Sequence, residues 1–276
     1  MKKALILCLL FFSACVPTNY FYYPNNNLHA DPEKFGLTYE IIDFPSLNGK
    51  KCTGLLFRTK EKPRGMVVHL HGNYGNVTYH FFGATFLLKY GFDVLVIDYQ
   101  GYGGSEGRPS PKKTVEDGIA AVRKAYSLNR SEMRDVFIFG QSLGAAVGAQ
   151  VAMREPLVKA IVMEAGFSSY RQMARHVLKK NVILWFLYPI APLFIGSTYD
   201  PIKAVAHISP KPIFFIHGNQ DKIVPVQMTE KLYKQAKEPK KIFIVYGADH
   251  LMCWKVLGQE YQEKISDFFL ENITIQ

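Results

Sequence analysis

The pentapeptide Gly140–Gly144 (GQSLG) restricts the fold of this chain more than any other segment, because of what stands on each side of it. An apolar run, 135–139, leads directly into it, and a helix of small residues, 143–153, follows without a connecting loop. The glycines two positions before and after Ser142 relieve the crowding of a sharp strand-to-helix turn, and such a turn exposes the side chain at its centre. A buried strand that passes straight into a helix is typical of a parallel sheet covered by helices.

The same alternation of strands and helices continues along the chain. Eight apolar or β-branched segments are predicted strands, at 37–44, 52–59, 66–70, 93–97, 135–139, 160–163, 213–216 and 242–246. Helical segments are predicted at 76–90, 112–129, 143–153, 226–237 and 253–270. Asn48-Gly49 joins the first two strands in a hairpin, since both residues accept positive φ. The sequence therefore predicts an α/β fold with a mostly parallel eight-stranded sheet, helices on both faces and an antiparallel edge.

One segment, at about 170–210, interrupts the alternation. It is apolar in its middle, at 185–190 and 192–195, and an insertion of this length in a compact domain is usually functional. We interpret it as a short helical cap over the site. Its aromatic residues either contact an acyl chain or another apolar group of a substrate, or form the small core of the cap itself.

The N-terminus has the pattern of an export signal. Residues 1–14 combine two lysines, a short apolar run and small residues, and are predicted to be a signal peptide. Cys15 follows, and Phe12-Ser13-Ala14-Cys15 resembles the bacterial lipobox, although leucine is more common at its first position. We expect Cys15 to be lipidated, 15–35 to be a tether and 36–276 to be the folded domain. The alternative is an ordinary signal peptide followed by an incidental cysteine.

This interpretation places the protein in the cell envelope as a membrane-anchored lipoprotein, at the outer membrane if the cell is Gram-negative. The formal charge of +10 suits an anionic membrane or envelope polymer, or is simply that of a solvated basic surface. No nucleic-acid motif occurs, so we expect no nucleic-acid partner. No cluster has metal-ligand spacing, and neither a metal nor another cofactor is expected. Cys52 and Cys253 remain for the exported domain, as a disulfide or as two free thiols.

Acyl transfer requires a nucleophile, a base, an acid that orients the base, and donors for the oxyanion. Ser142 is the candidate nucleophile. His250 directly follows the last strand and is the candidate base, and Asp221 follows the strand before it and is the candidate acid. Glu164, which ends the strand at 160–163, competes with Asp221 for that role. Asp249 is adjacent to His250, but neighbouring side chains on a turn diverge.

Main-chain N–H groups are the expected oxyanion donors. One belongs to Leu143, directly after Ser142. The second is expected in the glycine-rich loop 71–76 after the strand 66–70, where Asn73 is the candidate. A plain glycine-rich turn is the alternative for this loop.

Taken together, these motifs resemble an α/β-hydrolase subfamily that includes the bud-emergence-type hydrolases and the protein depalmitoylases. The resemblance runs from Tyr23-Pro24 to the C-terminal helix and is carried by HGNYGN at 71–76, DYQGYGGSEG at 98–107, GQSLG at 140–144, HGNQD at 217–221 and GADH at 247–250. The family usually has a basic residue where this chain has Gln100, and commonly an aspartate where it has Asn48. The order Ser142, Asp221, His250 is the order expected of α/β-hydrolases.

The expected function is hydrolysis of an ester or thioester, of a small molecule or an acylated substrate, through an acyl-enzyme on Ser142. An alternative is an aminopeptidase-type amide hydrolase, which needs an acid near the cap to bind the substrate amine; the nearby acids are Glu155, Glu164 and Asp200. A second alternative is a non-catalytic surface binding protein on the same fold. The sequence predicts no oligomeric state.

Overall fold

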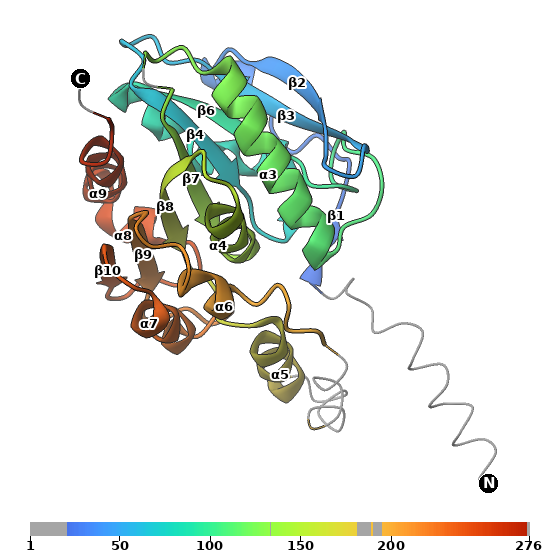
Figure 1. Cartoon of the computed structure of the whole chain (residues 1–276), viewed down its shortest axis with the longest axis vertical. Coiled ribbons are helices and arrows are strands. Elements are labelled where there is room, and N and C mark those ends of the chain that lie inside the picture. Colours follow the sequence, from blue (N-terminus) through green and yellow to red (C-terminus); the bar gives the residue numbers. More distant parts are fainter. Residues whose placement is uncertain (1–20, 133, 181–188, 190–194, 275–276) are drawn as a thin grey trace, which may run out of the picture.

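The computed structural model describes residues 21–132, 134–180, 189 and 195–274. Its centre is a sheet of eight strands, which confirms the predicted α/β-hydrolase fold (Figure 1). In spatial order these are β10 (Lys240–Val245), β9 (Ile213–Gly218), β8 (Val158–Glu164), β7 (Val136–Gln141), β4 (Gly65–Leu70), β6 (Phe92–Ile97), β3 (Lys51–Phe57) and β2 (Glu40–Pro45). The six strands from β10 to β6 are parallel, whereas β3 and β2 are antiparallel to their neighbours.

The predicted hairpin joins β2 and β3. Gly49 has a φ of +81°, which glycine adopts without strain, and its N–H donates to the carbonyl of Ser46 over 2.9 Å. The central strands β4, β6, β7 and β9 are buried along their whole length, as expected of parallel strands covered on both faces.

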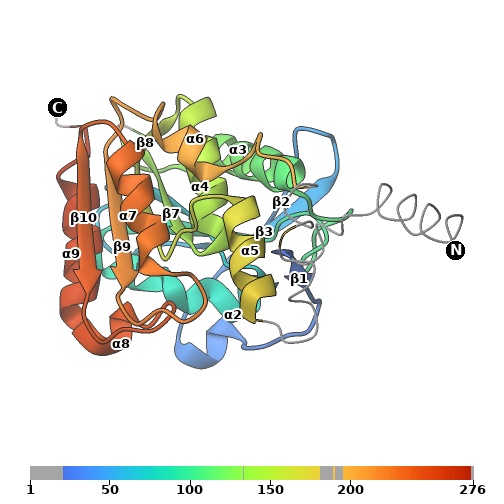
Figure 2. The ribbon, with the colours of Figure 1, turned by 90° about the horizontal axis from the view of Figure 1, so that it is seen from below.

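Successive side chains of a strand point to opposite faces, so each face of the sheet has its own hydrophobic core. Val68 and Ile138 belong to the core beneath the helices α3 (Pro111–Leu128), α4 (Leu143–Arg154), α6 (Pro201–Val205) and α7 (Val226–Gln235). Val67 and Phe137 belong to the core on the other face, which packs against η4 (Thr85–Tyr90) and α9 (Gln259–Leu270). Figure 2 shows the helices on both sides of the sheet.

Two predicted helices are each divided. The segment 76–90 forms α2 (Val77–His80) and the short 3-10 helices η3 (Phe81–Gly83) and η4. At the C-terminus, α8 (Cys253–Leu257) and α9 are separate, because Gly258 has a φ of +58° and a ψ of −122°.

The predicted cap is described only in part. Its helix α5 (Tyr170–Lys180) is present, whereas the apolar residues 185–188 and 190–194 lie outside the described residues. The predicted signal peptide, 1–14, and Cys15 also lie outside them. Within the described ranges, no helix is both long and apolar enough to cross a membrane.

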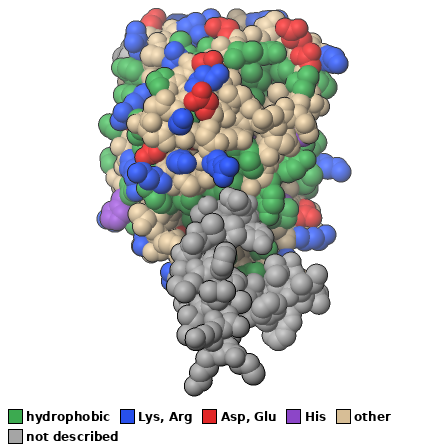
Figure 3. All heavy atoms as spheres, turned by 90° about the vertical axis from the view of Figure 1, so that its right-hand side faces the viewer, with side chains coloured by type: hydrophobic (Ala, Val, Ile, Leu, Met, Phe, Trp, Pro, Cys, Tyr) green, Lys and Arg blue, Asp and Glu red, His purple; other side chains and the backbone are tan. Residues whose placement is uncertain are grey.

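Residues of the predicted tether from Phe21 onwards pack on the domain. They contain the short strand β1 (Tyr23–Pro24), which pairs with β5 (Tyr74–Gly75), and the 3-10 helix η2 (Pro32–Phe35). On the face seen in Figure 3, Lys and Arg side chains lie among hydrophobic ones. Cys52 and Cys253 are both buried free thiols.

Candidate active site

The candidate site lies at the carboxyl edge of the sheet, where the ends of parallel strands meet. Ser142 follows β7, the loop containing Asn73 follows β4, Asp221 follows β9 and His250 follows β10. In open α/β sheets this edge is where ligands bind. The topology thus brings together side chains that are far apart in the sequence.

The turn at Ser142 is strained. Its φ of +54° and ψ of −112° are unusual for a residue with a Cβ, and such a conformation costs on the order of 1–3 kcal/mol. A main-chain hydrogen bond helps to hold the turn in place, since the Ser142 N–H donates to the carbonyl of Glu164 over 2.8 Å. Gly144 lies against the backbone of β4, and a Cβ on it would be 1.8 Å from the carbonyl oxygen of Leu70. The turn therefore requires glycine at 144.

Three side chains form a hydrogen-bonded chain. Nε2 of His250 lies 3.1 Å from Oγ of Ser142, and Nδ1 of the same ring lies 2.7 Å from Oδ2 of Asp221. A carboxylate only accepts hydrogen bonds, so the proton of the neutral imidazole is on Nδ1 and the lone pair of Nε2 faces the serine hydroxyl. Ser142 and the His250 side chain retain a little exposure, whereas the Asp221 side chain is fully buried.

Asp221 is held in its ionised form. Burial alone would raise its pKa, but hydrogen bonds from His217 and His250 outweigh burial, and the pKa lies well below its ordinary value of 3.8. The other carboxylate oxygen, Oδ1, accepts the main-chain N–H groups of Ile223 and Val224, each over 2.8 Å.

His217 is a residue whose contact with Asp221 sequence reasoning missed. Its Nε2 lies 3.0 Å from Oδ2 of Asp221 and 2.9 Å from the carbonyl of Val224, so this nitrogen carries a proton. Its Nδ1 lies 2.7 Å from Oγ1 of Thr229. The signal in the sequence is its place four residues before Asp221 in HGNQD.

The two competing acids have other partners. Oε2 of Glu164 accepts from Nε2 of Gln141 and from the hydroxyl of Tyr261, each over 2.7 Å, and burial raises its pKa. Asp249 accepts the main-chain N–H groups of Lys222 and of His250 over 3.0 and 2.8 Å, which joins the loops after β9 and β10. Asp221 is thus the acid that the fold brings to the His250 ring.

The loop after β4 lies against Ser142. A Cβ on Gly72 would be 3.9 Å from Cβ of Ser142. Nδ1 of His71 donates to the carbonyl of Gly72 over 2.7 Å, and Asn73 comes next in the chain. On the other side of Ser142, Leu143 is the first residue of α4, where main-chain N–H groups have no partner within the helix. Both predicted oxyanion donors are therefore near Ser142 in the chain or in space: Leu143 directly follows it, and Asn73 follows Gly72, which lies against it.

Gln100, which replaces the basic residue usual in the resembling family, fixes the loop after β6 through Asp117. Its main-chain N–H and its Nε2 donate to the two carboxylate oxygens of Asp117, over 2.9 and 2.6 Å. Ser46 Oγ donates to the same carboxylate over 2.6 Å, and Asn48 Nδ2 donates to Oε1 of Gln100 over 3.1 Å. In this chain, an uncharged amide therefore pins the loop.

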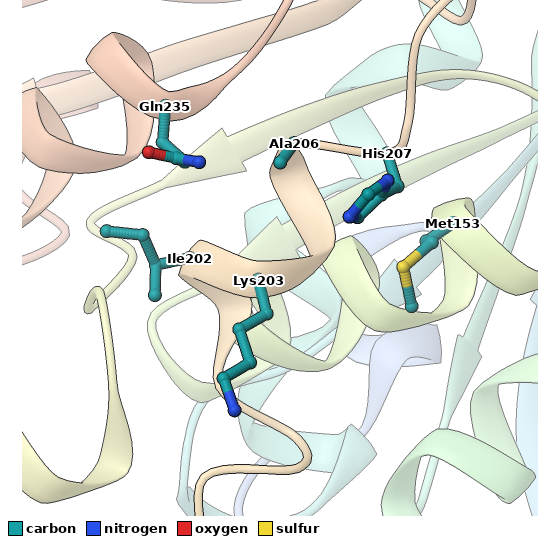
Figure 4. Close-up of a pocket in the computed structure, with 6 residues that line it drawn as sticks. All are labelled: Met153, Ile202, Lys203, Ala206, His207 and Gln235. Carbon is teal, nitrogen blue, oxygen red and sulfur yellow. The ribbon is translucent and has the colours of Figure 1, made fainter.

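A hollow of about 500 Å³ lies elsewhere, between α4, α6 and α7 (Figure 4). Its lining residues are Met153, Ile202, Lys203, Ala206, His207 and Gln235. Met153 is eleven residues after Ser142 on α4, which is about 16 Å along a helix. We therefore assign this hollow no part in the chemistry at Ser142. Within the described ranges, no group of three or more His, Cys, Asp and Glu side chains is arranged to hold a metal ion.

Comparisons with known proteins place the family and the fold of this chain. The sequence model of the family described as serine aminopeptidase, S33, matches residues 61–207, more than half of the chain. The uncharacterized protein YfhR of Escherichia coli is 28% identical over 268 residues, covering 95% of this chain and 90% of its own. Protein bem46 of Schizosaccharomyces pombe is 26% identical over 249 residues, covering 87% and 80%. The Pyrococcus furiosus esterase Pf2001 superposes with a TM-score of 0.77 at 20% identity, covering 92% and 99%.

Proposed function

Because this chain belongs to the serine aminopeptidase (S33) family of α/β-hydrolases, we propose that it is a serine hydrolase that cleaves an ester or thioester through an acyl-enzyme on Ser142. The observation that carries the proposal is the hydrogen-bonded chain from Ser142 through His250 to the ionised Asp221. Such a chain supplies a nucleophile, its base and the group that orients the base.

The first half-reaction forms the acyl-enzyme. Nε2 of His250 accepts the hydroxyl proton as Oγ of Ser142 bonds to the substrate carbonyl carbon, whose oxygen becomes an oxyanion. Asp221 stabilises the imidazolium that results. When the intermediate collapses, the bond to the leaving oxygen or sulfur breaks, and that atom takes the proton from His250.

The second half-reaction releases the acid. Water gives a proton to His250 and attacks the acyl carbon. When this second tetrahedral intermediate collapses, its bond to Oγ of Ser142 breaks, His250 returns the proton to Oγ, and the acid leaves. In both halves, the N–H groups of Asn73 and Leu143 donate to the oxyanion. Loss of one such donor typically costs about 100- to 1000-fold in rate.

The acids near the cap favour an ester or thioester over an aminopeptidase substrate. An aminopeptidase needs a free carboxylate for the substrate amine, but each of the three acids considered for that role already has partners. Oε2 of Glu155 is 2.7 Å from Nε of Arg123, and Oδ1 of Asp200 accepts the N–H of Tyr170 over 2.9 Å. Glu164 is buried with Gln141 and Tyr261.

A fluorophosphonate probe tests the nucleophile. We expect wild-type protein to be labelled and Ser142→Ala to be unlabelled, with hydrolysis of a short ester falling by about 10⁶-fold. If folded wild-type protein is neither labelled nor active, the proposal of a serine hydrolase is wrong, and the alternative of a non-catalytic binding protein is supported.

A substrate panel tests the bond that is cleaved. Matched acyl esters, acyl thioesters and aminoacyl amides are compared by kcat/KM, together with a series of acyl-chain lengths. We expect turnover of esters and thioesters to exceed turnover of amides. Faster amide turnover would reverse the order and favour the aminopeptidase.

We also propose that Cys15 carries the lipid anchor that holds the domain at an envelope membrane. Several acyl chains on one cysteine give stable anchorage to an otherwise soluble domain. Cys15→Ser is expected to move the protein from the membrane fraction to the soluble envelope fraction. The anchor is refuted if mass spectrometry of the wild-type protein finds no acyl modification and Cys15→Ser remains membrane-bound.

A further inference from the structure

The segment that connects the predicted anchor to the domain is paired with the candidate oxyanion loop. β1 runs parallel to β5, with Tyr23 opposite Tyr74 and Pro24 opposite Gly75. The main-chain N–H of Tyr23 donates to the carbonyl of Asn73 over 2.8 Å. The hydrogen bond from this segment therefore ends on the residue proposed to bind the oxyanion.

Several contacts besides this hydrogen bond fix the segment. Tyr22 is only 3% exposed, and its hydroxyl is 3.4 Å from that of Tyr170, the first residue of α5. The ring of Phe21 meets Tyr170 edge-on, with centroids 5.1 Å apart. The carbonyl of Asn25 accepts from the N–H of Gly103 and from Nδ2 of Asn76, over 3.2 and 3.0 Å. The segment is thus joined both to the oxyanion loop and to the cap helix.

Two peptide planes determine where the N–H of Asn73 points. A trans peptide is planar, with its C=O and N–H directed oppositely, so the His71 hydrogen bond to the Gly72 carbonyl orients the Asn73 N–H in the same plane. The next plane carries the Asn73 carbonyl, which accepts from Tyr23 N–H and from the Tyr102 hydroxyl, each over 2.8 Å. With both planes held, the backbone of Asn73 has little freedom to rotate.

We propose that the main-chain N–H of Tyr23, together with the Tyr102 hydroxyl, is a positioning group for the oxyanion hole. The segment after the anchor is then part of the catalytic apparatus. This inference rests on the proposed function, because it assigns the Asn73 N–H to the oxyanion.

The position of Tyr23 allows its N–H to be tested apart from its side chain. The side chain is 50% exposed, so Tyr23→Ala removes little packing and keeps the N–H. Tyr23→Pro removes the N–H, and proline is tolerated in an edge strand.

The experiment measures kcat and KM for a soluble short-chain ester. Wild type and Ser142→Ala are compared first, because the absence of Ser142-dependent turnover refutes the proposed function itself. We then expect Tyr23→Pro to lower kcat by about 10- to 100-fold with KM nearly unchanged, somewhat less than the loss of a whole donor. Tyr23→Ala shortens the same side chain but keeps the N–H, so its kcat should exceed that of Tyr23→Pro by about 10-fold or more.

Tyr102→Phe is the second test, because it keeps the ring and removes the other donor to the Asn73 carbonyl. It should likewise lower kcat more than it raises KM. If Tyr23→Pro folds and matches Tyr23→Ala while wild-type turnover depends on Ser142, the inference is wrong and the proposed function stands. If Tyr23→Pro does not fold, an unchanged kcat in Tyr102→Phe overturns the inference, and a lowered kcat at constant KM supports it.

Discussion

At the scale of single residues, two buried carboxylates near the proposed base, His250, have pKa values shifted in opposite directions by their surroundings. Asp221 receives hydrogen bonds from two histidines and two main-chain N–H groups, and its pKa is lowered. In Glu164 burial outweighs the hydrogen bonds from Gln141 and Tyr261, and its pKa is raised. A carboxylate that must stabilise a developing imidazolium has to be ionised, which favours Asp221 as the acid of the triad.

This difference predicts opposite outcomes for two matched amide substitutions. Asp221→Asn leaves the size of the side chain nearly unchanged but removes the charge and the constraint on the His250 tautomer, so kcat should fall by about 10⁴-fold. Glu164→Gln should retain kcat within about tenfold, since an amide oxygen still accepts from Gln141 and Tyr261. Steady-state measurement of kcat for both variants on a short-chain ester tests this prediction. A larger loss in Glu164→Gln than in Asp221→Asn would make Glu164 the acid.

The two variants also predict opposite dependences of stability on pH. With a lowered folded pKa, Asp221 contributes stability that is fully present above its ordinary pKa of 3.8 and is lost as the pH falls through the lower folded pKa. With a raised folded pKa, Glu164 contributes stability that is present below its ordinary pKa of 4.5 and is lost as the pH rises.

Urea unfolding of wild type and both variants between pH 3 and pH 8 measures this dependence. The advantage of wild type over Asp221→Asn should grow with pH, and its advantage over Glu164→Gln should shrink. Parallel curves for the two variants would show that neither carboxylate has the pKa direction inferred from its contacts.

The sequence predicted Ser142, Asp221 and His250 from their places after strands, because each strand is apolar and each residue directly follows its strand or lies a few residues beyond it. It could not predict the contact between His217 and Asp221. That contact depends on the turn after β9, which directs the two side chains to the same point, and side-chain direction in an irregular turn carries no periodic signal in the sequence.

At the scale of elements, β4, β6, β7 and β9 were predictable because they are buried and alternate with helical segments, and β2 and β3 because Asn48-Gly49 marks the turn between them. The pairing of β1 with β5 was not, since each strand has two residues and the pair lies about fifty residues apart in the chain. The division of the helix after Asn76 was also missed. Local propensity does not report such tertiary contacts.

The close packing of α4 against the end of β4 predicts that two glycines of the same helix differ in their tolerance of alanine. Gly144→Ala would place a Cβ 1.8 Å from the Leu70 carbonyl oxygen, which only a backbone shift can relieve, so unfolding free energy should fall by more than about 3 kcal/mol. Gly148→Ala on the same helix is the control. Its Cβ would meet side-chain ends of Ile161 and Ile138 at 3.0 and 3.1 Å, and alanine favours the helix. Equal midpoints of thermal unfolding would contradict the packing described here.

At the scale of the whole molecule, only a short stretch of chain connects the proposed anchor, Cys15, to the domain that carries the candidate site. Five residues lie between Cys15 and Phe21, the first described residue, and the six residue-to-residue steps of an extended chain span at most about 22 Å. From Phe21 onwards the segment is fixed to the oxyanion loop and to the cap helix. If Cys15 is lipidated, the carboxyl edge of the sheet is therefore held close to the bilayer, where an acylated substrate embedded in the membrane can be reached.

This arrangement predicts that tether length affects membrane-embedded substrates alone. Inserting about 20 Gly and Ser residues between Cys15 and Phe21 makes the tether a flexible coil and lowers the effective concentration of the site at the bilayer. Hydrolysis of a long-chain ester in anionic vesicles should fall several-fold, whereas hydrolysis of a short soluble ester should not change, because the insertion leaves β1 and its hydrogen bond to Asn73 in place. The same insertion in Cys15→Ser is the control, and there it should affect neither substrate. An equal loss on both substrates would mean that the insertion disturbs the site itself, and an unchanged rate on vesicles would mean that the anchor does not position the enzyme.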